Sequence, residues 1–184
     1  MLTDFQKLKI RHYFKLWDYE RRGYIDFGDF MQLTNRILHI KGLSPDSAEY
    51  KSMVAYTRQL WEEVILPFAD PKNEGKVSAE EYLRFAEHML PIAKAMADRK
   101  EPDPYGAAFF QMMDTDGDGK VAYRDWAAFI LAWGIKDHLV EHFTRMDTDG
   151  DGYITLDDLM ALYNQFLFSD DPSEPGNYLF GALD

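Results

Sequence analysis

The sequence contains no cysteine, which excludes disulfide bonds, thiolate metal ligands and a cysteine nucleophile. Basic residues are also scarce, with 20 Lys and Arg against 32 Asp and Glu and a formal net charge of -12. Nucleic-acid binding is therefore not expected, because lysine and arginine are needed to displace counterions from phosphates. The acidic balance instead suits a protein that binds cations.

Long apolar runs are missing as well. No stretch reaches the roughly 18 apolar residues of a membrane-spanning helix, so no membrane span is expected. The first 20 residues intersperse charges among apolar residues and lack the apolar core of a signal peptide. Together with the absence of cysteine, these features favour a cytoplasmic protein.

A twelve-residue pattern is present four times. The segment DTDGDG begins two complete copies, DTDGDGKVAYRD (residues 114–125) and DTDGDGYITLDD (residues 147–158). Both have glycine at position 6 and a β-branched apolar residue at position 8. Two weaker copies, DYERRGYIDFGD (residues 18–29) and DPKNEGKVSAEE (residues 70–81), keep these two positions. We call the four copies loops 1 to 4 in chain order.

Mostly apolar residues flank each loop at the spacing of one helix face. Before loops 1, 3 and 4 they are Ile10, Tyr13, Phe14 and Trp17; Gly106, Phe109, Phe110 and Met113; and Leu139, His142, Phe143 and Met146. After loops 1 to 4 they are Phe30, Leu33, Thr34 and Ile37; Tyr82, Phe85, Ala86 and Met89; Trp126, Phe129, Ile130 and Trp133; and Leu159, Leu162, Tyr163 and Phe166. Only the helix entering loop 2 departs from this pattern, because the charged residue Glu62 occupies the first of its four core-facing positions. The repeat predicts a mainly α fold of four helix-loop-helix units.

The repeat also predicts the domain organisation. Residues 1–98 contain the degenerate loops 1 and 2, and residues 99–184 contain the intact loops 3 and 4 with a C-terminal tail, residues 167–184. Within each pair, we expect short β-bridges at position 8. The linker RKEPDP (residues 99–104) contains Pro102 and Pro104, which disfavour a long connecting helix, so we expect the two lobes to pack into one compact body.

This is the EF-hand pattern, in which a loop surrounds Ca²⁺ with oxygen ligands from positions 1, 3, 5, 7, 9 and 12. Position 7 offers its backbone carbonyl, and glycine at position 6 allows the sharp turn. The predicted ligands of loop 3 are Asp114, Asp116, Asp118, Lys120 and Asp125, with Ala122 at position 9 leaving room for a water. Those of loop 4 are Asp147, Asp149, Asp151, Tyr153, Thr155 and Asp158.

Loops 1 and 2 are predicted to be structural, with each loop pairing with its neighbour to complete a lobe of two hands. Loop 1 has Arg22 at position 5, where an oxygen belongs, so a weak third site in residues 18–29 requires Arg22 to swing out. Loop 2 has Lys72 at position 3, and Pro67 disturbs the last turn of its entering helix.

Position 12 carries aspartate in both intact loops, whereas this position usually carries glutamate. Aspartate is one methylene shorter and more often supplies one oxygen than two. A coordination number near six suits Mg²⁺, so we expect Asp125 and Asp158 to lower the preference for Ca²⁺ and to allow Mg²⁺ to compete.

Over nearly its whole length, the chain resembles the sarcoplasmic calcium-binding proteins and their calerythrin-like bacterial relatives. The resemblance rests on the four EF-hand frames, the long segment between loops 1 and 2, and PGNYLFG in the tail (residues 175–181). It implies a compact cytosolic Ca²⁺ buffer; some members also bind at the first site, where Arg22 departs from the ligand pattern.

The predicted function is Ca²⁺ binding by a monomeric cytoplasmic buffer or storage protein, and no enzymatic site is recognisable. The alternative is a sensor that opens an apolar groove to a protein target. The nine methionines support this alternative, because flexible methionine side chains suit such a groove. A carrier of an apolar small ligand is a further alternative. In a buffer, we expect Tyr178, Leu179 and Phe180 of the tail to cover the apolar surface that a sensor would expose.

Overall fold

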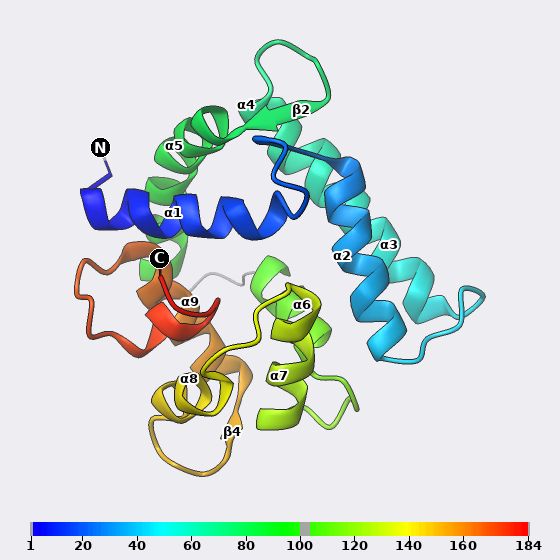
Figure 1. Ribbon diagram of the computed structural model, residues 1–184, viewed down its shortest axis with the longest axis vertical. Coiled ribbons are helices and arrows are strands. Elements are labelled where there is room, and N and C mark those ends of the chain that lie inside the picture. Colours follow the sequence, from blue (N-terminus) through cyan, green and yellow to red (C-terminus); the bar gives the residue numbers. More distant parts are fainter. Residues whose placement is uncertain (1, 100–103, 184) are drawn as a thin grey trace. The chain divides into compact units, whose positions relative to one another are not determined.

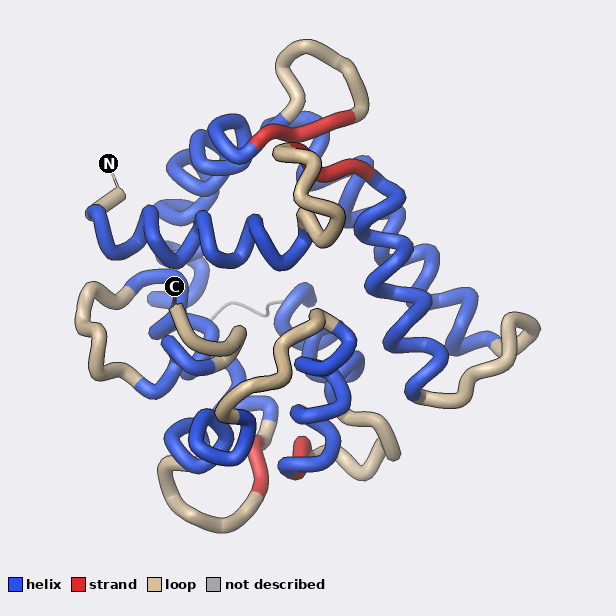
Figure 2. Tube along the Cα trace, viewed as in Figure 1, coloured by secondary structure: helices blue, strands red, loops and turns tan. Residues whose placement is uncertain are grey.

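The chain is mainly helical, as predicted, and the computed structural model describes residues 2–99 and 104–183 (Figure 1). Each of the four loops lies between two helices, and each contains a short strand (Figure 2). The elements are α1 (Asp4–Trp17), β1 (Tyr24–Asp26), α2 (Phe27–Ile40), α3 (Ala48–Gln59), the π-helical turn η1 (Leu60–Ile65), α4 (Leu66–Ala69), β2 (Lys76–Ser78), α5 (Ala79–Asp98), α6 (Pro104–Met113), β3 (Val121–Ala122), α7 (Tyr123–Ala132), α8 (Leu139–Met146), β4 (Tyr153–Ile154), α9 (Leu156–Phe168) and the 3₁₀ turn η2 (Pro175–Tyr178).

The chain forms two compact units. One unit is Ile10–His88 and contains loops 1 and 2; the other combines Met1–Lys9 with Met89–Asp184 and contains loops 3 and 4. Helices α1 and α5 each contribute residues to both units. Of the predicted linker, residues 100–103 lie outside the described residues. No helix in the described part of the chain has the length and apolar character needed to cross a membrane.

Short antiparallel ladders join the loops in pairs, as predicted. Strands β1 and β2 pair with Ile25 opposite Val77, and strands β3 and β4 pair with Val121 opposite Ile154. These four residues hold position 8 of their loops, and their side chains are at most 1% exposed. Each ladder therefore hydrogen-bonds the backbones of two loops and buries a β-branched pair beneath them.

The unit Ile10–His88 has an aromatic core at the end of loop 1. The ring of Phe30 stacks on that of Trp17 at a centroid distance of 3.9 Å and lies 5.0 Å from that of Trp61. Both Phe30 and Trp17 come from the predicted helix faces. Phe30 is 2% exposed and Trp61 is 3% exposed. The helix α1, which enters loop 1, and the turn η1, which precedes loop 2, therefore both pack against α2, which follows loop 1.

A π-helical turn explains why the helix entering loop 2 departs from the repeat. In η1, the backbone N–H of Leu66 donates to the carbonyl of Trp61, five residues earlier. Pro67 follows directly and has no N–H to donate. A π turn accommodates one extra residue, which rotates the upstream helix relative to the loop. The repeat places residue 62 on the core-facing side of this helix. In the structure, Trp61 is buried there instead and Glu62 is exposed.

The tail packs on the helices of loops 3 and 4. Gly176 in η2 lies so close to α9 that an added Cβ would stand 2.1 Å from the carbonyl oxygen of Leu162. Beyond η2, Leu179 and Phe180 are both 0% exposed. The small glycine therefore allows the close approach that carries these two apolar residues into the core.

A buried lysine of α1 caps the C-terminal end of α9. The ammonium of Lys9 is 0% exposed and donates to the carbonyls of Gln165 and Ser169 at 3.2 and 2.6 Å. A cation at this position satisfies carbonyls that the helix leaves without partners and complements the helix dipole. Burial lowers the pKa of Lys9 to about 8, although the negative charges of Asp170 and Glu174 oppose the decrease.

Candidate metal centre

Loop 4 wraps its backbone around the carboxylate of its first residue. Asp147 accepts hydrogen bonds from the N–H groups of Gly150 and Gly152, each at 3.0 Å. Asp151 accepts the N–H of Tyr153 at 2.9 Å. As a result, Asp147, Asp149 and Asp151 bring carboxylate oxygens within 4.8 Å of one another. Three carboxylates at this separation repel one another unless a cation lies between them.

Loop 3 repeats this arrangement. Asp114 accepts the N–H groups of Gly117 and Gly119 at 2.8 and 3.0 Å, and Asp114, Asp116 and Asp118 form the second group of carboxylate oxygens within 4.8 Å. Across residues 2–99 and 104–183, these two are the only such groups of metal-ligating side chains. Their donors are all oxygens, which fits a hard cation such as Ca²⁺ or Mg²⁺.

Glycine at position 6 is required by the backbone. Gly119 has φ of +83° and Gly152 has φ of +85°, a conformation that costs other residues energy. This turn directs the following residue into the ladder, so that Tyr153 lies in β4 and Lys120 directly precedes β3. The ammonium of Lys120 lies 4.5 Å from the centre of the Tyr153 ring, which links the two position-7 side chains.

The position-12 aspartates lie in the first turns of the exiting helices. Asp158 accepts the N–H of Thr155 at 2.9 Å and its hydroxyl at 2.6 Å, and the Thr155 hydroxyl caps the N–H of Asp158. Asp125 accepts the N–H of Ala122 at 3.1 Å. Neither aspartate is in the three-carboxylate group of its loop. Each lies instead in the first turn of its helix, where its carboxylate accepts the N–H of the residue that precedes the helix.

Sequence reasoning missed two side chains that contact the predicted ligands of loop 3. The hydroxyl of Thr115, at position 2, donates to Asp125. Arg124, at position 11, forms an ion pair with Asp116, and its side chain is 71% exposed. Position 2 has threonine in both intact loops, which was an available signal. Arg124 gave none, because position 11 is not a ligand position.

Loops 1 and 2 hold side-chain cations against their carboxylates. In loop 1, burial acts to raise the pKa of Asp26, but hydrogen bonding to Arg22 and the charge of Arg22 lower it below its usual value. Burial raises the pKa of Asp29 despite the opposing hydrogen bonds from Asp26 and Arg22. In loop 2, the hydrogen bonds from Ser78, helped by Lys72, lower the pKa of Glu81 to about 2.

Comparisons with known proteins identify the family. Models of the EF hand match residues 107–130 and 139–163, and a model of an EF-hand domain pair matches residues 1–37. Sarcoplasmic calcium-binding proteins I, III and IV of Branchiostoma lanceolatum are 34% identical to the chain over 127 residues, which cover 68% of each sequence. The chain belongs to the sarcoplasmic calcium-binding protein family.

Solved structures agree with this family assignment. A sarcoplasmic calcium-binding protein from amphioxus is 27% identical, with a TM-score of 0.74 and 98% of each chain covered. The calcium-loaded apo form of the coelenterazine-binding protein from Renilla muelleri is 25% identical, with a TM-score of 0.73, and the match covers 99% of this chain and 100% of that one. The predicted EF-hand fold and family resemblance are confirmed, and Ca²⁺ binding by EF-hands follows from both.

Proposed function

We propose that this member of the sarcoplasmic calcium-binding protein family is a monomeric cytosolic buffer or store of Ca²⁺ and Mg²⁺, with loops 3 and 4 as its two working sites. The ligands are those of the two intact loops: Asp114, Asp116, Asp118, Lys120 and Asp125, and Asp147, Asp149, Asp151, Tyr153, Thr155 and Asp158. The main support is the burial of the tail, because a sensor needs an apolar surface that a target protein can reach.

Phe180 of the tail lies in an aromatic cluster of the unit that contains loops 3 and 4. Its ring lies 4.9 Å from that of Phe166, 5.7 Å from that of Phe109 and 6.0 Å from that of Trp133. These three residues lie on the core faces of α9 and α6 and at the end of α7. The protein's own tail thus takes the contacts that a target peptide makes with an open EF-hand pair.

The position-12 aspartates support the choice of ions. Asp125 and Asp158 each lie at the first turn of the exiting helix and are shorter than the usual glutamate. One oxygen from each leaves a site near six-coordination, which Mg²⁺ accepts. Mg²⁺ then occupies the sites at resting Ca²⁺ levels, and its release limits how fast Ca²⁺ binds.

Calorimetric titration with Ca²⁺, with and without millimolar Mg²⁺, tests the proposed ion competition. A buffer binds two Ca²⁺ ions per chain, and Mg²⁺ lowers the apparent affinity at least about tenfold, which is about 1.4 kcal/mol. Calcium affinity that is unaffected by Mg²⁺ would contradict mixed sites. The same titration with an apolar-surface dye reports whether a groove opens.

Tail variants test whether Leu179 and Phe180 keep the apolar surface covered. In the wild type, Ca²⁺ produces no dye fluorescence; after deletion of residues 172–184, or in Leu179→Ala with Phe180→Ala, Ca²⁺ produces it. The exposed tail variant Ala182→Ser is the matched control and behaves as the wild type. Calcium-dependent dye fluorescence in the wild type itself would favour the sensor.

A carrier of an apolar ligand is the alternative supported by the likeness to the coelenterazine-binding protein. Coelenterazine is therefore the probe, and quenching of tryptophan emission is the readout, since Trp126 and Trp133 lie in the core of this unit. Saturable quenching that the Phe180→Ala variant strengthens would favour a carrier that competes with the tail. The buffer predicts no saturable quenching in the wild type.

A further inference from the structure

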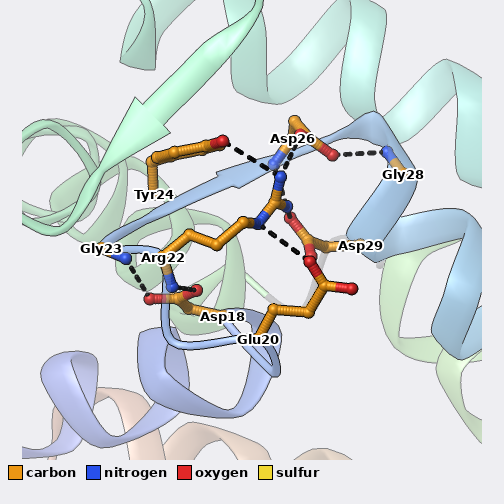
Figure 3. Close-up of polar contacts among 8 residues, drawn as sticks. All are labelled: Asp18, Glu20, Arg22, Gly23, Tyr24, Asp26, Gly28 and Asp29. Atoms are coloured by element: carbon orange, nitrogen blue, oxygen red, sulfur yellow. Dashed lines mark hydrogen bonds and ion pairs between the residues drawn. The ribbon is translucent and has the colours of Figure 1, made fainter.

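The guanidinium of Arg22 lies among the carboxylates of loop 1 (Figure 3). It donates to Asp26 at 2.9 Å and to Asp29 at 2.6 Å, and it forms an ion pair with Glu20 at 3.5 Å. Glu20, Asp26 and Asp29 hold positions 3, 9 and 12 of the loop, which are ligand positions in an EF-hand. A cation that belongs to the chain therefore contacts three of the groups that would otherwise contact the metal ion.

The rest of loop 1 has the backbone arrangement of a binding loop. Asp18 accepts the N–H groups of Arg22 and Gly23, at positions 5 and 6, each at 2.7 Å; in loop 4, Asp147 accepts those of Gly150 and Gly152, at positions 4 and 6, so both loops share the bond from position 6 to position 1. Gly23 has φ of +79° and Gly152 has φ of +85°. Loop 1 is thus assembled around Arg22 in the way that loop 4 is assembled around its ligand group.

The side chain of Arg22 is held in place on several sides. Its guanidinium lies 4.5 Å from the centre of the Tyr24 ring and donates to the Tyr24 hydroxyl at 3.2 Å. The side chain of Asp29 is only 3% exposed, so moving Arg22 away leaves a buried carboxylate without its counter-charge. A metal ion must displace these contacts before it gains any of its own.

We infer that Arg22 acts as the built-in cation of loop 1, which keeps Ca²⁺ out of the first hand and keeps this loop assembled in the absence of any metal ion. The guanidinium balances the carboxylates and joins the strand β1 to the first turn of α2. The first hand then holds its ladder with loop 2 at every Ca²⁺ concentration. In loop 1, the residue at position 5 therefore determines that the hand does not respond to the ion.

Loop 2 provides the contrast within the same pair. Its cation, Lys72, contacts the position-12 residue Glu81 at 3.1 Å, but the Lys72 side chain is 63% exposed. A single exposed ion pair contributes little, because water screens it. Arg22 contacts three carboxylates and an aromatic ring, whereas the ion pair of Lys72 is with the single carboxylate of Glu81. The assembly of this pair of loops therefore depends mainly on Arg22.

The variant Arg22→Asp tests this inference, because it restores an oxygen ligand at position 5. Calorimetry on the full chain is expected to count one more Ca²⁺ ion per chain than in the wild type, and NMR is expected to show that Ca²⁺ shifts the Gly23 amide. Without Ca²⁺, the Gly23 amide of the variant exchanges at least about tenfold faster, because like charges now meet in the loop. The wild-type Gly23 amide is protected and does not respond to Ca²⁺.

The matched control is Arg21→Asp, which makes the same charge change at the exposed neighbouring position. Arg21 has φ of +55°, which aspartate tolerates better than most residues. We expect it to bind no additional ion and to leave Gly23 protected. Arg22→Met removes the cation without adding a ligand, so it is expected to lose protection at Gly23 and gain no site.

Two results would overturn the inference. One is a wild-type Gly23 amide that shifts on addition of Ca²⁺, which means that the first hand binds the ion with Arg22 present. The other is an Arg22→Met variant whose Gly23 protection without Ca²⁺ equals that of the wild type. Because both readouts come from loop 1, they are separate from the stoichiometry and ion preference proposed for loops 3 and 4.

Discussion

Loops 1 and 4 have the same length and share aspartate at positions 1 and 12, glycine at position 6 and isoleucine at position 8. They differ at position 5, where loop 1 has Arg22 and loop 4 has Asp151. In loop 4, Asp151 joins two other carboxylates in a group that needs a cation. In loop 1, Arg22 is itself the cation. From the same frame, we therefore expect one loop that depends on an ion and one that does not.

The two loop pairs also differ in how charge stabilises them. Loops 1 and 2 contain the ion pairs of Arg22 and Lys72 with their position-12 carboxylates. In loop 3, Arg124 pairs with Asp116 and, at 3.7 Å, with the position-12 residue Asp125, but its side chain is 71% exposed, so water screens both pairs. Ion removal is thus expected to act on loops 3 and 4 far more than on loops 1 and 2.

Removal of Ca²⁺ and Mg²⁺ by a chelator is expected to have the largest effect. At a free ion concentration one hundred times the dissociation constant, each site contributes about 2.7 kcal/mol, so two sites contribute about 5 kcal/mol. Hydrogen exchange should show this loss of protection at the Gly152 amide, while the equivalent Gly23 amide keeps its protection. Equal deprotection of both amides would remove the distinction between the two pairs.

Ile25 of loop 1 and Ile154 of loop 4, both at position 8, allow a matched test of whether the pairing of two loops affects ion binding. Ile25 and Ile154 are 0% and 1% exposed, so Ile25→Ala and Ile154→Ala should each lower the free energy of unfolding by about 2–5 kcal/mol. We expect Ile154→Ala also to weaken Ca²⁺ binding, because it disturbs the pairing of loops 3 and 4. Ile25→Ala should leave calorimetric Ca²⁺ affinity unchanged; an equal loss of affinity in both variants would contradict separate roles for the pairs.

Exchange of the position-12 aspartates is expected to sharpen the ion preference of loops 3 and 4. In Asp125→Glu with Asp158→Glu, each carboxylate reaches one methylene further and can bind Ca²⁺ through both oxygens. The ratio of Ca²⁺ to Mg²⁺ affinity should rise about tenfold, or about 1.4 kcal/mol, in competition titrations. The corresponding Asp29→Glu exchange in loop 1 is the control and should change no affinity.

Acid unfolding is expected to reveal a smaller contribution from Glu81 in loop 2. The folded pKa of Glu81, about 2, lies below the ordinary value of 4.5, so the ionised group stabilises the fold above pH 4.5. This contribution is lost as the pH falls from 4.5 to 2. The difference in urea stability between wild type and Glu81→Gln should be about 1 kcal/mol at pH 6, since water screens the Lys72 partner, and should vanish near pH 2. A difference that depends on Ca²⁺ would argue against an ion-independent loop 2.

Much of the fold was predictable because the repeat constrains both the loops and the helices that flank them. The glycines at position 6 and the β-branched residues at position 8 predicted the turns and the two ladders, and the helix faces predicted core residues such as Phe30, Trp126 and Phe166. The departure at Glu62 was visible, but its cause was not. The π turn depends on which residue of the upstream helix reaches the core, and Trp61 fills that space.

The carboxylate groups of loops 3 and 4 were predictable because local backbone hydrogen bonds bring positions 1, 3 and 5 together. The direction of Arg22 was not, because a long flexible side chain can extend into water or fold inward. Its inward position depends on the Tyr24 ring and on Asp29, which lies seven residues away at the start of α2.

The order of residues thus specifies the four hands and the carboxylate groups of loops 3 and 4, because these features depend on neighbours within about a dozen residues. The ladders join residues that are far apart in the sequence, and they were predictable because each loop repeats a β-branched residue at position 8. Tertiary packing decides that Trp61 is buried in place of Glu62 and that Phe180 fills the aromatic cluster of loops 3 and 4. Each of these depends on side chains that long-range folding brings together, and burial makes each choice energetically decisive.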